Sequence, residues 1–314
     1  MKKGFSYLLL TITTVIWGFA FVAQEMATVI PPFYVGALRS VFASALLLIA
    51  IPIMDRVTKN GRKLLAPKVI FDFNRHELIG GVILGVIITV ATGFQQYGLG
   101  QGTDSGKAAF ITALYVVFVP ILSSFLGKRP SLFAIISIPI AIVGSYFLCM
   151  KPGMSLALSD TLVIVCAIVF ACDIIVVDRF SPKCDGVRMS FIQFLVSFVL
   201  NTILALIFEK TPEPQAVLSV LPPLMYLGIL SSGVGYTLQI IGQKDTDPTI
   251  ASMIMSLESV FGVVGAAIFT SKTMTTREYL GCGIMLTAIL LAQLNKATVQ
   301  KLFKRRKGEE NEKS

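Results

Sequence analysis

The chain has 314 residues, of which 54% are hydrophobic and only 14% are charged, and its formal net charge is +9. Typical soluble domains contain about 25% charged residues, so this composition excludes a soluble globular protein and predicts a polytopic membrane protein. Five cysteines, an odd number without metal-ligand spacing, argue against a disulfide framework and favour a role as small apolar packing residues.

The apolar runs predict an all-α polytopic membrane protein with ten transmembrane helices. A spanning helix needs about 20 largely apolar residues, and helices satisfy every backbone polar group in lipid. The runs are too long and continuous for the strands of a barrel. The ten predicted spans are residues 5–27, 32–54, 77–99, 105–126, 131–150, 159–180, 187–208, 220–242, 248–269 and 276–295.

Lysine and arginine are distributed unevenly between the connections. If both termini are cytoplasmic, 21 of these residues lie on the inner side and five on the outer side, while Arg39 lies within the second span. Positive charge marks the cytoplasmic side, so we expect cytoplasmic N- and C-termini and a bacterial plasma-membrane location. The basic tail 296–314 is then expected to lie near anionic lipid of the bilayer. The net charge therefore requires no nucleic-acid partner.

The two halves of the chain match each other in order. TVIWGFAFVA (14–23) aligns with IVFACDIIVV (168–177), ALRSVFAS (37–44) with FIQFLVSF (191–198), and TDSGKAAFITALYVVF (103–118) with TDPTIASMIMSLESVF (246–261). The alignment places Trp17 near Phe170 and Ala20 near Asp173, and it pairs Arg39 with Gln193 and Tyr115 with Glu258. It predicts a five-helix half at 1–150, a second at 151–295, and the tail. Five is odd, so the halves would be inverted, as in many secondary transporters.

The same stretches carry a resemblance to a known family. TTVIWGFAF in span one, LRS in span two, TDSGKAAFITALYVVFVPI entering span four, and SLESVFGVV in span nine resemble the drug/metabolite transporter superfamily, specifically its EamA-type branch. The resemblance covers residues 1–295. It implies ten helices, two inverted EamA repeats and movement of small organic solutes, often outward. Family members often have an acidic residue after spans four and nine, where this chain has Lys128 and Lys272.

Charged side chains inside spans are costly and mark candidate functional sites. Glu258 is predicted near the midplane, where it could bind a cationic group, carry a proton, or serve as a paired structural acid. Asp173 has the same two functional roles as candidates, or pairs with a neighbouring helix. Arg39 suits a carboxylate or phosphate, but it could also snorkel outward or be pinned to Glu25. We therefore place Glu258, Asp173 and Arg39 among the substrate-binding candidates, with Glu258 and Asp173 as candidates for proton coupling.

Aromatic and amide side chains complete the candidate set. Trp17, the only tryptophan, and Tyr115 would line the solute path or simply pack. Gln95 and Gln193 are further substrate-binding candidates, although amides such as Gln193 also hydrogen-bond across helices without touching solute. His76, the only histidine, is predicted at the membrane border and is interpreted as a surface residue.

These features favour a secondary transporter that moves a small-molecule solute by alternating access between the two halves. An acid at the midplane and an arginine nearer the outside would hold the two ends of a zwitterion, so an amino acid or related metabolite is the preferred cargo. The alternative within this fold is an exporter of drugs or cationic compounds. A channel would need a ring of charges or a carbonyl filter, and an intramembrane enzyme a nucleophile with a base; neither pattern is evident. We expect no cofactor and no metal, and the oligomeric state stays open.

Overall fold

The computed structural model describes residues 3–58, 72–128, 130–150, 157–270 and 275–292, which form helices and no strand. The first half contains α1 (Lys3–Met26), η1 (Ala27–Val29), α2 (Pro32–Thr58), α4 (Arg75–Gly100), α5 (Ser105–Ala113), α6 (Tyr115–Phe125) and α7 (Leu132–Cys149). The second half contains α8 (Leu158–Phe180), η2 (Ser181–Lys183), α9 (Gly186–Phe208), α10 (Pro214–Ser219), α11 (Leu221–Met225), η3 (Tyr226–Gly235), α12 (Tyr236–Gln243), α13 (Pro248–Met255), α14 (Glu258–Thr270) and α15 (Thr276–Ala292).

The predicted spans coincide with these helices. Within the described residues, nine helical segments are long and apolar enough to cross a membrane, which confirms the all-helical polytopic class. The tenth predicted span, 276–295, corresponds to α15, of which 17 residues are described. Ten crossings therefore stay a prediction. The junction at 151–156, the end of the last predicted span at 293–295 and the tail at 296–314 lie outside the described residues.

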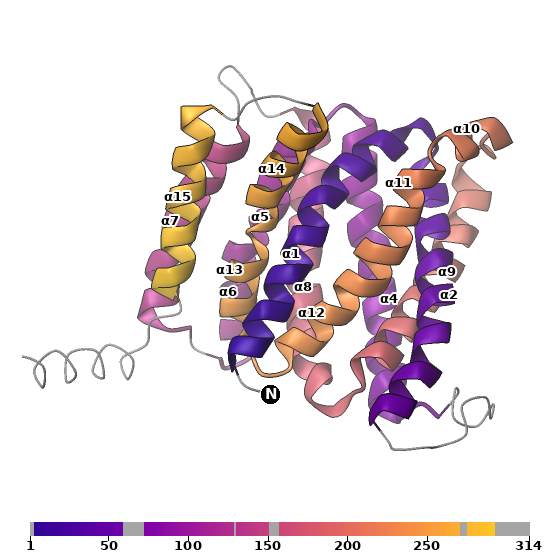
Figure 1. Cartoon of the computed structure of the whole chain (residues 1–314), viewed down its shortest axis with the longest axis horizontal. Helices are drawn as coiled ribbons and strands as arrows, with labels where there is room; N and C mark the ends of the chain where they lie inside the picture. Colours follow the sequence, from indigo (N-terminus) through magenta and orange to yellow (C-terminus); the bar gives the residue numbers. More distant parts are fainter. Residues whose placement is uncertain (1–2, 59–71, 129, 151–156, 271–274, 293–314) are drawn as a thin grey trace, which may run out of the picture.

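The helices form one bundle in which the two halves are interleaved (Figure 1). Helices α2 and α9 pack together at one end of the bundle, and α7 and α15 pack together at the other. Between these pairs stand α1, α8 and the broken helices. The start of α8 lies beside the end of α4, since Ser159 and Asp160 bond to Thr103. The helix termini form two faces of the bundle. We call the face at which α1 begins the N-terminal face, and the face at which α8 begins the opposite face.

Polar caps fix where the helices begin. The Asn74 side chain accepts the Glu77 backbone N–H at 2.8 Å while the Glu77 carboxylate accepts the Asn74 N–H at 2.9 Å, a complete capping box for α4. Asp104 caps α5 and Asp247 caps α13. These two aspartates are equivalent in the internal alignment. The Thr-Asp pair therefore precedes the corresponding helix in both halves. Its carboxylate accepts hydrogen bonds from backbone N–H groups that have no partner within the helix.

Small residues allow the closest helix contacts. A Cβ added at Gly81 would lie 2.6 Å from the Ile192 Cβ, and one added at Gly85 would lie 2.6 Å from the Val196 Cβ. The spacing of the two glycines predicts this close contact, and it brings α4 against α9. These two glycines therefore let helices from the two halves approach each other closely.

Spans four and nine are each broken at one point, and the two breaks are equivalent in the internal alignment. The first falls at Leu114, between α5 and α6, and the second at Ser256 and Leu257, between α13 and α14. At both points a backbone N–H bonds three residues back, from Leu114 to Ile111 and from Leu257 to Ile254. Pro120 lies near the first break, but the second half has no proline there, so the break does not depend on proline.

Candidate functional site

The breaks place Tyr115 and Glu258 at the first position after each interruption, and both line one small cavity inside the bundle. The cavity measures about 30 Å³, which is enough to hold water, since a water molecule needs about 10–15 Å³ of such space. Its walls come from both halves. The lining residues are Trp17, Ala20, Phe21, Gln24, Arg39, Gln95, Thr112, Tyr115, Phe170, Ser231, Tyr236 and Glu258.

Arg39 reaches the cavity from α2 and is only 5% exposed. Its Nε donates to the Ser232 hydroxyl at 2.9 Å, and its Nη2 donates to the Ser231 hydroxyl at 3.3 Å. Glu25, the alternative partner considered from the sequence, is exposed. Neutral hydroxyls satisfy hydrogen bonds but carry no charge. Among the described residues no acid forms an ion pair with Arg39, so the guanidinium carries an unneutralised positive charge at the cavity.

Glu258 is the acidic group of the cavity, and it is 3% exposed. The Tyr115 hydroxyl lies within interacting range of this carboxyl group, although neither that hydroxyl nor Oε1 makes a hydrogen bond of ordinary geometry. No ion pair joins Glu258 to Arg39 among the described residues. A buried carboxyl group and a buried guanidinium thus share one cavity without neutralising each other directly.

An aromatic wall adjoins these polar groups. The rings of Trp17 and Tyr236 have centroids 4.6 Å apart, and the Trp17 indole N–H donates to the Ser231 carbonyl at 3.2 Å. That carbonyl belongs to η3, a π-helical segment, and such segments occur frequently at functional sites. The Thr13 hydroxyl, which donates to the Leu9 carbonyl of its own helix at 3.0 Å, also lies 3.3 Å from the carbonyl of Gly235 in the same segment. Helix α1 is therefore fastened to η3 along the cavity wall.

The structure brings together five of the seven residues expected to bind substrate. Trp17, Arg39, Gln95, Tyr115 and Glu258 line the cavity, and the Gln95 side-chain amide donates to the Thr112 hydroxyl at 3.0 Å. The other two, Asp173 and Gln193, are each 1% exposed and lie outside the set of lining residues. His76 is exposed, as expected.

Sequence reasoning missed several lining residues. Phe170 is equivalent to Trp17 in the internal alignment, so the repeat itself could have identified it. Tyr236 and Ser231 carried no such signal, because their positions depend on the irregular backbone of η3. Gln24 and Thr112 are polar residues on predicted helices, and periodicity did not indicate which way they face.

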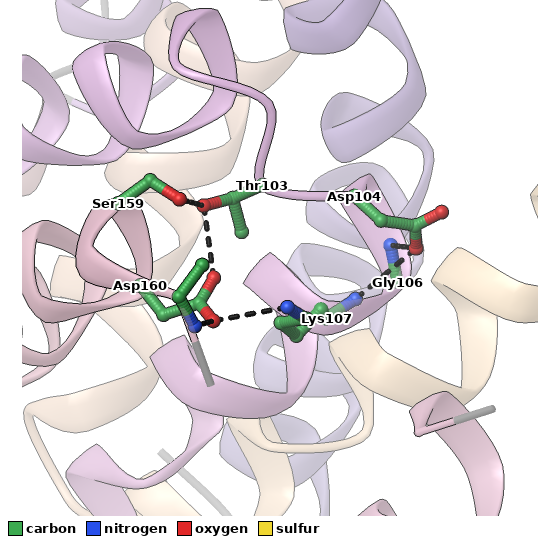
Figure 2. Close-up of polar contacts among 7 residues, drawn as sticks. Thr103, Asp104, Gly106, Lys107, Ser159 and Asp160 are labelled. Atoms are coloured by element: carbon green, nitrogen blue, oxygen red, sulfur yellow. Dashed lines mark hydrogen bonds and ion pairs between the residues drawn. The ribbon is translucent and has the colours of Figure 1, made fainter. Parts of the chain in front are cut away.

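A buried polar cluster joins the two halves at the opposite face (Figure 2). Lys107 of α5 forms an ion pair with Asp160 of α8, at 2.9 Å between Nζ and Oδ2. Thr103 donates to the other Asp160 oxygen at 3.0 Å and lies 3.1 Å from the Ser159 hydroxyl. Asp160 also accepts the Ala157 N–H at 2.7 Å. The carboxylate is therefore fully partnered, and it ties the end of α4 and the start of α5 to the start of α8.

Helices α2 and α9 are joined by carboxylates at both of their ends. At the N-terminal face, Asp55 of α2 forms a buried ion pair with Arg188 of α9. At the opposite face, Glu209 at the end of α9 accepts the backbone N–H groups of Phe33 and Tyr34 at 3.0 Å and 3.2 Å. Asp55 and Glu209 are equivalent in the internal alignment. Each half thus supplies an acid that holds the first turn of the other half's helix.

Comparisons with known proteins agree with this architecture. A model of the EamA-like transporter family matches residues 4–150 and 157–294. A protein of Archaeoglobus fulgidus described as an uncharacterized transporter is 27% identical over 219 residues, which is 68% of each chain. The Bacillus subtilis protein YoaV, also described as an uncharacterized transporter, is 22% identical over 89% of this chain and 95% of its own. A solved crystal structure aligns with a TM-score of 0.70 at 18% identity, over 92% of this chain and 96% of that chain.

Proposed function

Because the chain belongs to the EamA-like transporter family and is a multi-pass membrane transporter, we propose that it carries a small zwitterionic metabolite, with an amino acid or a related compound as the preferred cargo. The observation that carries this proposal is the cavity shared by both halves, into which Arg39 and Glu258 bring opposite charges without pairing. An α-carboxylate would bind the guanidinium, and an ammonium group would bind the carboxylate.

The aromatic residues provide the third element of recognition. Trp17, Phe170 and Tyr236 line the space between the two charged groups and offer apolar surface to a side chain. Apolar walls with a few oriented polar groups are the usual composition of a small-molecule site. This arrangement favours a zwitterion with an apolar side chain over a small hydrophilic ion.

Transport requires the cavity to enlarge. A volume of about 30 Å³ holds water, whereas sites for organic ligands measure about 300–1,000 Å³. Polar contacts between the halves occur at both faces, through Asp55 and Arg188 at one and Lys107 and Asp160 at the other. We propose that these contacts break in turn, so that the inverted halves rock around the site and expose it to each side alternately.

Direction and location form part of the same proposal. The resemblance to the EamA-type branch supports outward movement across a bacterial plasma membrane, with both termini in the cytoplasm. Under that orientation the opposite face is extracellular, and Lys107 and Asp160 form the outer contact. Attaching a membrane-impermeant label to single cysteines placed at Glu213 and Asp72 tests the orientation. Labelling from outside is expected at position 213 and not at position 72.

A second cargo class is favoured by a specific observation. Glu258 shares the cavity with Trp17 and Tyr236, and a carboxylate with aromatic rings is a suitable site for a lipophilic cation. This arrangement supports an exporter of cationic drugs as the alternative. Arg39 distinguishes the two classes, because a buried guanidinium repels a cation that has no anionic group.

Counterflow in proteoliposomes tests the proposal. Vesicles containing the purified protein are preloaded with an excess of one unlabelled amino acid, and uptake of the same labelled compound is followed against protein-free vesicles. Saturable uptake accelerated by the preload is expected for at least one amino acid with an apolar side chain. If every amino acid fails while a lipophilic cation succeeds, the zwitterion proposal is wrong and the cationic alternative holds. Flux that is neither saturable nor accelerated would indicate a channel.

A further inference from the structure

Asp173 lies outside the residues that line the cavity, yet it is an almost completely buried acid. It is 1% exposed and comes from the middle of α8. Its Oδ2 accepts a hydrogen bond from the Gln239 side-chain amide of α12, at 3.0 Å. Its Oδ1 has no hydrogen-bond partner, and neither does the Oε1 of Gln239, which is also 1% exposed. One acid and one amide thus share a hydrogen bond and leave two acceptor oxygens unpartnered.

No cation neutralises this acid among the described residues. The titratable side chains that interact with it electrostatically are Tyr236 of α12 and Cys172 of α8 itself. Helices packed against α8 carry their charged side chains near their ends, far along the chain from contact with Asp173: Arg75, His76 and Glu77 begin α4, and Lys107 in the first turn of α5 pairs with Asp160. A charged carboxylate buried without a counter-ion is expensive.

One proton on Asp173 gives both unpartnered oxygens, Asp173 Oδ1 and Gln239 Oε1, a hydrogen bond. A proton on Oδ1 turns that oxygen into a donor, and Gln239 offers the unpartnered acceptor Oε1 on the same amide that already donates to Oδ2. A carboxylic acid and an amide can form two hydrogen bonds in one ring, which satisfies every polar atom of the pair. We propose that Asp173 and Gln239 form a proton-binding site that is separate from the solute cavity, with Asp173 as the group that is protonated.

Tyr236 connects this site to the cavity. Its ring lines the cavity and contacts Trp17, and its hydroxyl group interacts electrostatically with Asp173, Arg39 and Glu258. Gln239 follows Tyr236 by three residues, so both side chains lie on one side of α12. A change in the charge of Asp173 therefore acts on the helix that forms one wall of the solute site. This coupling rests on the proposed carrier function, whereas the proton site itself does not.

Infrared difference spectroscopy of the purified protein in liposomes tests the proton site without any solute. A protonated carboxyl group in an apolar environment gives a C=O stretching band that is absent from a carboxylate and shifts in D₂O. Spectra recorded between mildly acidic and mildly alkaline pH are expected to show such a band in the wild type. The band should persist in Glu258→Gln and disappear in Asp173→Asn. In Gln239→Leu it should shift, because the hydrogen bonds to the acid are lost.

The outcomes separate this proposal from the carrier proposal. A band that disappears in Glu258→Gln and remains in Asp173→Asn would overturn the assignment, as would the absence of any protonated-carboxyl band in the wild type. Asp72→Asn, which changes an exposed acid beyond the spans, is the matched control and should leave the band unchanged. If Asp173→Asn does not fold, Gln239→Leu decides: a shifted band supports the site and an unshifted band contradicts it. None of these results depends on finding the transported solute.

Discussion

Lys107 and Asp160 form a buried ion pair at the opposite face, whereas the equivalent positions at the N-terminal face hold Ile250 and Tyr7. The lysine and aspartate side chains are 9% and 1% exposed. Ile250 and Tyr7 are partly buried and pack against the main hydrophobic core. This ionic contact between the inverted halves therefore has no equivalent at the N-terminal face, where the halves are joined instead by the ion pair of Asp55 and Arg188.

Lys107→Met is expected to weaken closure at the opposite face. The substitution leaves Asp160 buried without its cation, and breaking one side of a buried pair typically costs about 3–5 kcal/mol. The retained hydrogen bonds from Thr103 and Ala157 should reduce this cost to the lower part of that range. Two measurements check the result: a lower melting temperature, and faster labelling of a single cysteine introduced at Gln24, which lines the cavity.

The double variant Lys107→Met with Asp160→Asn serves as the control. Removing both charges should recover much of the lost stability, because no buried charge is left unpaired. If Lys107→Met and the double variant both have the melting temperature of the wild type, the ion pair does not hold this face closed.

The helices were predictable because lipid imposes a simple rule on the backbone. Long apolar runs must be helical in the membrane, and the predicted span 77–99 differs from α4 by only a few residues. The breaks at Leu114 and Leu257 were not predictable in the same way. Hydropathy has no signal for a single interrupted backbone hydrogen bond, and the nearby Pro120 has no counterpart in the second half.

The site was predictable where charge identified it and unpredictable where side-chain direction decided it. Glu258 and Arg39 stood out because a charge inside a span is costly, and both line the cavity. Asp173 stood out for the same reason but faces Gln239 instead. Depth along a helix follows from residue number, whereas direction also depends on how neighbouring helices rotate. Tyr236 shows this most clearly, since the π-helical turns of η3 change the direction of every residue that follows.

Gly85→Val is expected to destabilise the contact between α4 and α9. Even the first added carbon would lie 2.6 Å from the Val196 Cβ and 2.7 Å from the Gln193 carbonyl oxygen. Overpacking of this kind typically costs about 1–3 kcal/mol, which thermal unfolding in detergent will measure. Gly283→Ala is the control, because nothing lies within 4 Å of its added carbon. Equal melting temperatures for the wild type and Gly85→Val would contradict the close packing.

Arg39→Lys is expected to weaken solute binding while keeping the positive charge. Lysine lacks the planar guanidinium group, whose several N–H donors can bond to Ser232 and to a bound carboxylate at the same time. The KM for counterflow should therefore rise about tenfold, equivalent to about 1.4 kcal/mol. Arg277→Lys provides the same chemical change on α15, where Arg277 stacks on Tyr146 away from the cavity. An unchanged KM in Arg39→Lys would remove Arg39 from the binding site.

Glu258→Gln is expected to fold normally and to impair transport or its dependence on pH. The amide preserves the size of the side chain but can neither bind an ammonium group as an anion nor exchange a proton. Glu278→Gln is the matched control, because that side chain caps α15 through Thr275 and lies outside the cavity. Monodisperse Glu258→Gln protein with wild-type transport at every pH examined would show that the carboxyl group has no part in the cycle.

Trp17 makes solute binding directly observable, because it is the only tryptophan in the chain and it lines the cavity. Its ring lies 4.6 Å from that of Tyr236, and its N–H bonds to the Ser231 carbonyl in η3. A solute that enlarges the cavity must change both contacts, so its addition should change the tryptophan emission in a saturable way. Half-saturation should occur at a higher solute concentration in Arg39→Lys than in the wild type.

Trp17→Phe should show no saturable signal, since no other indole is present. If a solute that passes the counterflow test leaves the wild-type emission unchanged, binding does not alter the surroundings of Trp17, and the solute site lies elsewhere in the bundle.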